Sequence, residues 1–189
     1  MEVDIEAALP KLKKQGRLHA LRRISALGRI TYEALRFEGD STVKTNVIAR
    51  YLAADVQSQD SDEASLAVTP ANYKFKYTGM ANNAGRPVYV FHLTPKKKQV
   101  GAFKGELWLD AETCLPVRES GRLVKNPSIF VRRIDFVREY DIESGLAIPR
   151  QIASTVETRL VGKAELTIRF HDLALAASPS LSMAAGSGQ

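Results

Sequence analysis

The chain has 189 residues, of which 44% are hydrophobic and 25% are charged, and its formal net charge is +6. This length suits one domain with a sizeable core, and the composition is that of an ordinary globular protein, which excludes a chain that is disordered throughout. The longest apolar runs have only a few residues, which excludes a transmembrane helix. Cys114 is the only cysteine, so an internal disulfide is excluded as well.

The net charge and the first residues bear on partners and location. A basic excess favours nucleic acid, anionic lipid head groups or an acidic protein surface, but an excess of this size is a weak signal, and we expect no nucleic acid. The start, Met1–Glu6, is acidic and lacks the apolar core of a secretory signal. The protein is therefore either cytoplasmic or exported with its signal removed, and these residues do not decide between the two.

The first 28 residues carry both helical and strand signals. Residues 10–28 are rich in Leu, Ala, Lys and Arg, which are good helix formers, and we expect a helix in their first part. Residues 19–25 also alternate with a period of two, so they stay ambiguous between helix and strand. We treat 1–28 as a helical or mixed segment that packs on a main domain at 29–175.

The main domain opens with a strand and a helix. Residues 29–37 alternate as a strand does, and Gly39-Asp40 predicts a turn. Asp40 then offers a capping oxygen to a helix that carries apolar residues on one face, from Val43 to Leu52. The segment 57–65 has almost no apolar residue and is predicted to be an exposed loop.

From Tyr73 to Leu173 alternating apolar and polar residues replace the helical signal. Consecutive strands with this alternation predict an antiparallel sheet that has one buried and one solvated face. The fold class is therefore mainly β with some helix (α+β). The predicted strands lie at about 73–77, 88–93, 103–110, 115–124, 130–142, 152–160 and 166–170, with turns at 82–85, 110–113 and 144–145. The small and polar tail, 176–189, is predicted to be disordered.

The apolar face of a single sheet has to be covered. Composition favours the simpler alternative, in which the helix from Val43 and the N-terminal segment fill that face. In the other alternative the sheet curves into a partly closed barrel that holds an apolar ligand, with the helix as a lid. Burial of a C16 acyl chain would contribute about 12 kcal/mol before ordering costs, so no charged site would be needed to hold it.

The sequence shows no catalytic or metal-binding signature. His19, His92 and His171 are isolated, and Cys114 has no nucleophile motif around it. Asp110 and Glu112 flank a predicted turn, where an aspartate commonly binds nearby backbone N–H groups. The acidic group Asp60, Asp62 and Glu63 lacks the glycine and final glutamate of a calcium loop. We therefore expect no enzymatic activity, no metal and no cofactor.

Six segments of the sheet region resemble a family of bacterial envelope proteins. They are similar to the outer-membrane lipoprotein-sorting proteins of the LolA/LolB-like superfamily, which also includes RseB-type sensors. The resemblance covers about residues 29–173. It is carried by NYKF (72–75), GRPVYVFHLTPKKK (85–98), FKGELWLDAET (103–113), LPVRESG (115–121), KNPSIFVRR (125–133) and ETRLVGKAELTIRF (157–170).

This resemblance implies a half-open antiparallel β-barrel with an apolar concave face, helices across its mouth, a periplasmic location and no enzymatic activity. Our leading hypothesis is a monomeric carrier or chaperone for lipid or acylated protein. We expect the helix to act as a lid, with Val47 and Tyr51 facing inward. The residues expected to line the ligand site are Tyr89, Phe91, Leu93, Leu107, Leu109, Ile134, Phe136, Tyr140, Val156, Ile168 and Phe170.

The alternative hypothesis is an envelope sensor or interaction module of the same fold, which carries no ligand. It would contact a partner protein through the basic loop Lys96, Lys97 and Lys98, or through the loop 126–128. The three lysines are most simply a solvated loop, but they could also meet phosphate head groups or an acidic surface.

Overall fold

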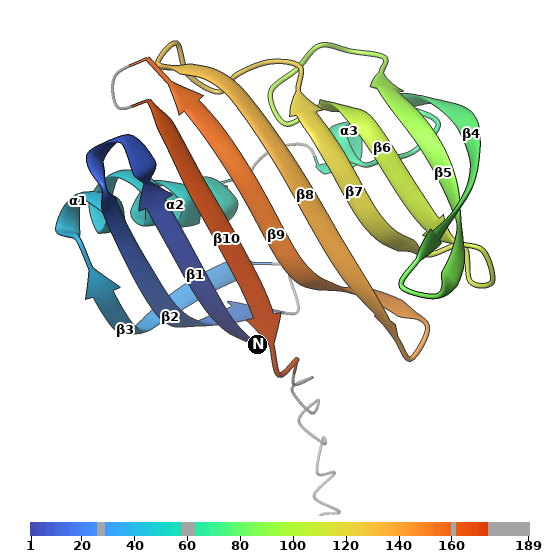
Figure 1. Cartoon of the computed structure of the whole chain (residues 1–189). Helices are drawn as coiled ribbons and strands as arrows, with labels where there is room; N and C mark the ends of the chain where they lie inside the picture. Colours follow the sequence, from blue (N-terminus) through green and yellow to red (C-terminus); the bar gives the residue numbers. More distant parts are fainter. Residues whose placement is uncertain (26–28, 58–62, 160–161, 174–189) are drawn as a thin grey trace, which may run out of the picture.

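In the computed structural model, which describes residues 1–25, 29–57, 63–159 and 162–173, the chain forms one large antiparallel sheet (Figure 1). Its ten strands follow the order β3-β2-β1-β10-β9-β8-β7-β6-β5-β4. The strands are β1 (Glu2–Leu9), β2 (Lys14–Ile24), β3 (Ile30–Gly39), β4 (Tyr73–Asn83), β5 (Arg86–Pro95), β6 (Phe103–Asp110), β7 (Pro116–Leu123), β8 (Val131–Glu143), β9 (Leu146–Thr158) and β10 (Lys163–His171).

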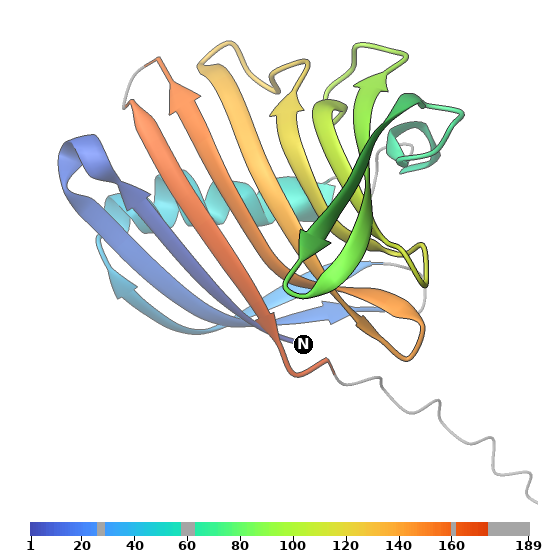
Figure 2. The same cartoon turned by 45° about the vertical axis from the view of Figure 1, so that its right-hand side comes forward.

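The predicted fold class is confirmed. The sheet curves strongly but does not close, because β3 and β4 remain as its two edges (Figure 2). The first and last strands are neighbours, as the third and fourth strands from the β3 edge, and Ile5 of β1 lies opposite Ile168 of β10. The result is a half-open barrel whose apolar side chains face the concave side.

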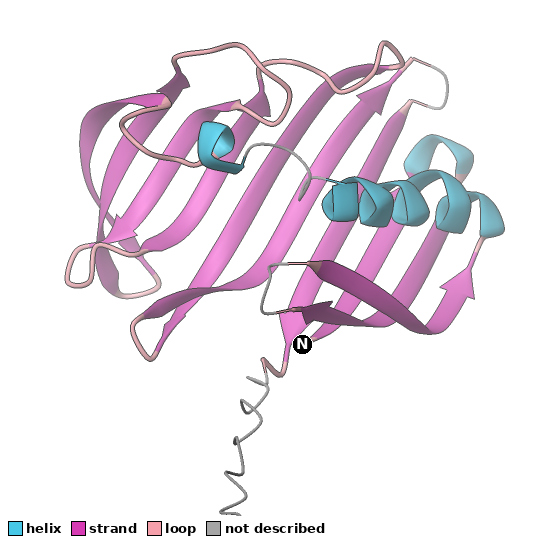
Figure 3. Ribbon diagram, turned by 180° about the vertical axis from the view of Figure 1, so that it is seen from behind, coloured by secondary structure: helices cyan, strands magenta, loops and turns pink. Residues whose placement is uncertain are grey.

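One helical run crosses this concave side (Figure 3). It consists of α1 (Ser41–Val43), a π-helical segment η2 (Lys44–Ile48) and α2 (Ala49–Gln57). The predicted cap is present, since the backbone N–H of Thr42 donates to the Asp40 carboxylate at 2.7 Å. Lys14 of β2 also lies 3.2 Å from this carboxylate, so the start of the helix is fixed to the sheet.

The helix predicted in the first part of residues 10–28 is wrong. Only a single turn of 3₁₀ helix, η1 (Pro10–Leu12), forms there, and His19–Ile24, left ambiguous above, belongs to β2. Strand β2 pairs with both β1 and β3, and the burial of Leu18 and Ala20 outweighs a weak helix propensity. The N-terminal segment is therefore part of the sheet and not a layer packed on it.

The loop predicted at 57–65 also needs correction at both ends. Gln57 is the last residue of α2, and the short helix α3 (Glu63–Leu66) begins within the predicted loop. Gln99 ties this helix to the sheet by donating from Nε2 to the Ser65 carbonyl at 2.9 Å. Residues 58–62, including Asp60 and Asp62, lie outside the described residues, as does the predicted tail 176–189.

Most of the buried apolar side chains form two separate clusters on the concave side. The first joins the helical run to β1, β2 and β10, and Val43 and Ile48 are almost fully buried in it. The second lies at the other end of the sheet and is built on Tyr73, Leu93, Phe103, Leu107 and Phe136. The helical run therefore completes the core at one end of the sheet only.

We expect Ile48→Ala to lower the free energy of unfolding by about 2–5 kcal/mol, because removal of a side chain that is 1% exposed leaves a cavity under the helix. Val56, on the same helical run, is 40% exposed, and Val56→Ala should change stability by no more than about 0.5 kcal/mol. Urea denaturation followed by circular dichroism measures both. Equal losses would contradict the packing of the helix on the sheet.

Candidate functional site

The register of the strands places one row of side chains across the whole concave face. Directly paired residues of neighbouring antiparallel strands point to the same side of a sheet. From β2 to β4 the row is apolar at both ends and is interrupted by one charged pair in the middle. Its members are Leu18, Ile5, Ile168, Ile152, Arg138, Glu119, Leu107, Phe91 and Tyr77.

The structure places all eleven predicted lining residues on this concave face, but it divides them. Val156, Ile168 and Phe170 belong to the cluster under the helical run, where they pack together with Val47 and Tyr51. These two helical residues face inward as predicted. The space over this end of the sheet is thus filled by protein, as the simpler alternative above expects.

The other end of the concave face is covered less completely. Leu93, Leu107 and Phe136 are buried, but Tyr77 is 53% exposed and Met80 is 59% exposed. The rings of Tyr77 and Phe91 have centroids 5.5 Å apart, and the rings of Tyr77 and Tyr89 have centroids 6.3 Å apart. We call the partly exposed group the open floor; it consists of Tyr77, Met80, Tyr89, Phe91 and Leu109.

A charged pair marks the border between the filled end and the open floor. Nη1 of Arg138 lies 3.2 Å from Oε2 of Glu119, whose side chain is only 10% exposed. The guanidinium, on a side chain that is 45% exposed, sits 4.8 Å from the centroid of the Phe136 ring. Arg138 therefore offers part of its hydrogen-bonding capacity to a group lying on the concave face.

Tyr140 lies beside this pair. Burial, followed by the negative charge of Glu119, raises the pKa of Tyr140 to about 12. Its hydroxyl therefore stays protonated at physiological pH. Arg138 interrupts the apolar alternation along β8, and its carboxylate partner Glu119 comes from β7, so no local pattern of residues indicates the pair.

A second polar group fixes the far end of the helical run. The Tyr32 hydroxyl donates to Oδ2 of Asp55 at 2.7 Å and accepts a hydrogen bond from Nε of Arg22 at 3.0 Å. Burial, together with the charge of Asp55, raises the pKa of Tyr32. The helix is therefore held at its start by Asp40 and near its end by Asp55, which makes it a fixed plug in this structure.

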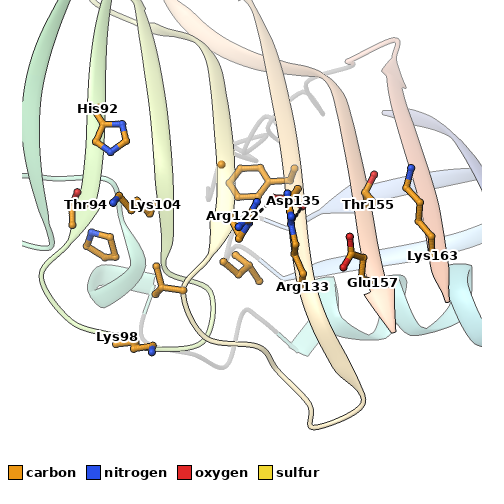
Figure 4. Close-up of a pocket in the computed structure, with 15 residues that line it drawn as sticks. His92, Thr94, Lys98, Lys104, Arg122, Arg133, Asp135, Thr155, Glu157 and Lys163 are labelled. Carbon is orange, nitrogen blue, oxygen red and sulfur yellow. Dashed lines mark hydrogen bonds and ion pairs between the residues drawn. The ribbon is translucent and has the colours of Figure 1, made fainter. Parts of the chain in front are cut away.

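The opposite face of the sheet carries an open groove of about 1110 Å³ (Figure 4). Seven of its fifteen lining residues are charged, and among them Asp135 accepts hydrogen bonds from both Arg122 and Arg133. Burial alone would raise the pKa of Asp135, but these two bonds and the charges outweigh it and lower the pKa below its usual range. Of the predicted lining residues, Phe136 alone touches this groove, and of the three lysines only Lys98 does.

The other candidate residues named in the sequence analysis have structural roles. Asp110 accepts hydrogen bonds from the backbone N–H groups of Glu112 and Thr113, as expected for a turn. His19 and His171 are not isolated in space, because the sheet brings both to Asp4, at 3.0 and 3.4 Å. Within the described residues no group of His, Cys, Asp and Glu side chains is placed to hold a metal ion.

Solved structures similar to this chain include proteins of the predicted family. A LolA superfamily protein from Nitrosomonas europaea is 15% identical, with a TM-score of 0.41 over 92% of this chain and 86% of that one. A DUF1329 family protein from Desulfovibrio piger is 14% identical, with a TM-score of 0.42 over 93% and 85% of the two chains. An outer-membrane lipoprotein-sorting protein domain from Vibrio parahaemolyticus is 11% identical, with a TM-score of 0.42 over 90% and 82%.

Similarity at this level assigns neither a ligand nor a partner, so the function has to be argued from the geometry of this chain. No protein-family model and no curated protein matches the sequence. Among the described helices, none is long and apolar enough to cross a membrane.

We expect Tyr140→Phe to reduce the loss of stability in alkali. A group whose pKa is raised by folding stabilises the folded state fully at pH values below its unfolded pKa. For Tyr140 this stabilisation is lost as the pH rises from 10 to about 12. The urea midpoint should fall less steeply over this window in Tyr140→Phe than in the parent. Tyr77→Phe, which changes a ring that is 53% exposed, should follow the parent, and identical slopes for all three proteins would contradict the assignment.

Proposed function

We propose that this protein is a non-enzymatic carrier of the cell envelope that holds the acyl chain of a lipid or lipoprotein against the open floor. The observation that carries the proposal is the incomplete cover of an apolar face. Five aromatic or aliphatic side chains of β4, β5 and β6 line the concave side, and two of them, Tyr77 and Met80, are more than half exposed. Such a surface has little use in a protein that only fills its own core.

The border of the open floor fits an amphipathic ligand. Arg138 is bound to one carboxylate and stacked on one ring, and 45% of its side chain remains accessible. A lipid head group or a glyceride ester could accept a hydrogen bond from this guanidinium while the acyl chain runs over Phe91 and Leu109. Because Tyr140 keeps its proton, it provides a second polar atom without adding a negative charge.

We infer that the helical run has a different role from the lid expected above. It is fixed at both ends and buries Val43 and Ile48, so we infer that it is a permanent plug of one half of the barrel. Of the eleven predicted lining residues, Val156, Ile168 and Phe170 then belong to the core under the plug. The proposed ligand site keeps Tyr89, Phe91, Leu109 and Tyr140, with Ile134 on the same face of β8, whereas Leu93, Leu107 and Phe136 are buried in the second cluster.

The periplasmic location and the monomeric state remain part of this proposal. They are supported by the resemblance of the sequence to envelope proteins and by a fold in which one chain completes its own sheet. Organic extraction of protein purified from the envelope of its host, followed by mass spectrometry, would identify a lipid that co-purifies with it.

We expect Tyr77→Ser/Met80→Ser to weaken binding of a fluorescent long-chain fatty acid roughly tenfold, because both side chains lose apolar contact with the chain. The matched control is Leu35→Ser/Leu146→Ser, which removes two side chains that are 52% and 59% exposed elsewhere on the sheet. The control should bind as the parent does. Both variants change exposed residues, so circular dichroism should show an intact fold, and equal affinities of the two would contradict the proposed floor.

A further inference from the structure

We propose that one rim of the half-barrel docks on the surface of an anionic lipid bilayer. The rim consists of the described residues of the loops that join β1 to β2 (10–13), β5 to β6 (96–102), β7 to β8 (124–130) and β9 to β10 (159 and 162). Because all strands are antiparallel, alternate loops lie at the same end, and the first three of these loops lie at the upper ends of their strands in Figures 1 and 2. Residues 160 and 161 lie outside the description.

The four loops carry charge of one sign, although the β3–β4 connection, which begins and ends at the same end of the sheet, contains Asp40 and Glu63. The described residues of the four loops contain no acidic residue, whereas the loops at the opposite rim contain Glu112 and one arginine, Arg29. All the cations of the rim are exposed and none forms an ion pair with a described carboxylate. They are Lys11, Lys13, Lys96, Lys97, Lys98, Lys125 and Arg159.

Two cations of the rim donate a hydrogen bond, but neither is neutralised by a negative charge. Lys96 donates from Nζ to the Pro70 carbonyl at 2.6 Å, and Arg159 donates from Nε to the Ile129 carbonyl at 2.9 Å. Neither acceptor is ionised. A nearby carboxylate, Asp40, is already bound to Lys14, so it does not cancel the charge of the loops.

Positive charge continues below the rim on the outer face. Lys104 of β6 lies directly opposite Arg122 of β7, a like-charge pair that destabilises a sheet unless an anion compensates it. Arg122 and Arg133 share a single carboxylate, Asp135. The groove of Figure 4 therefore extends the positive field of the rim onto the sheet.

Apolar side chains stand at the tips of the same loops. Leu12 is 44% exposed, Val100 is 44% exposed, Phe130 is 54% exposed and Ile129 is 79% exposed. Exposed apolar residues beside several lysines provide the two signals that stable attachment to a membrane surface requires. A protein interface would instead gather its apolar residues in one central patch, whereas these tips extend from the β1–β2 loop to the β5–β6 loop.

The loop that carries Ile129 and Phe130 is held in a fixed shape. The backbone N–H of Arg159 donates to the Phe130 carbonyl at 2.9 Å, and the backbone N–H of Val131 donates to the Ser128 carbonyl at 3.1 Å. Asn126 closes the loop by donating from Nδ2 to the Arg132 carbonyl at 2.8 Å. Two apolar side chains are thus presented to solvent without the ordering cost that a flexible loop would add on insertion.

The test is sedimentation of the whole chain with vesicles of phosphatidylcholine and phosphatidylglycerol in equal parts. We expect binding that falls as salt rises, and little binding to vesicles of phosphatidylcholine alone. Lys97→Gln/Lys98→Gln should weaken binding by a factor of about five for each lysine removed. The matched control, Lys76→Gln/Arg86→Gln, removes two exposed cations away from the rim and should stay within about twofold of the parent.

The apolar contribution is tested separately. Ile129→Ser/Phe130→Ser should weaken vesicle binding at low and high salt, and Leu35→Ser/Leu146→Ser should leave it unchanged. Equal binding to neutral and anionic vesicles, or equal binding of rim and control variants, would overturn the proposal. Capture of an acidic protein by a rim that binds no vesicle would also overturn it.

Docking and ligand binding can fail independently. The rim variant Ile129→Ser/Phe130→Ser should bind fatty acid as the parent does, because its side chains lie outside the open floor. The floor variant Tyr77→Ser/Met80→Ser should bind vesicles as the parent does. The rim proposal therefore survives if the acyl-carrier proposal is wrong.

Discussion

The structure depends on a mismatch between the width of the sheet and the length of the helix. Ten strands at about 4.8 Å spacing span roughly 43 Å, measured along the curve of the sheet. The helical run Ser41–Gln57 is about 25 Å long at 1.5 Å per residue. One helix can therefore cover little more than half of the apolar face. It packs on β1, β2, β3 and β10, and the floor built from β4, β5 and β6 keeps partly exposed aromatic rings.

Two polar groups on the apolar face have different consequences. Asp55 of the helical run meets Arg22 of β2 and Tyr32 of β3, and these hydrogen bonds fix the plug to both strands. Arg138 and Glu119 lie beyond the plug, where the carboxylate is buried but the guanidinium is partly accessible. A buried polar group without a partner is costly, so the first group explains why the helix stays in place. The second leaves hydrogen-bonding capacity next to an apolar surface.

The antiparallel arrangement separates two surfaces that an envelope carrier would need. Side chains that alternate along the strands decide what faces the concave side, whereas loops at one end of the strands decide what faces a membrane. The open floor is apolar and lies on the face of the sheet, while the cations and the apolar tips, such as Lys97 and Ile129, lie on its rim. A carrier with this division could approach a bilayer by its rim without covering its ligand site.

The sequence by itself determined the sheet, its alternation and most of its turns. Strands 73–173, the cap at Asp40 and the side to which each predicted lining residue points all follow from period-two patterns and turn chemistry, which are local properties. Only the tertiary structure decided that residues 14–24 form a strand, since pairing with β1 and β3 outweighs their helix propensity. It also decided which lining residues the plug covers, that Glu119 meets Arg138, and that cations of distant loops lie at one end of the sheet. These are contacts between segments far apart in the chain, and no local pattern of residues encodes which strand lies beside which.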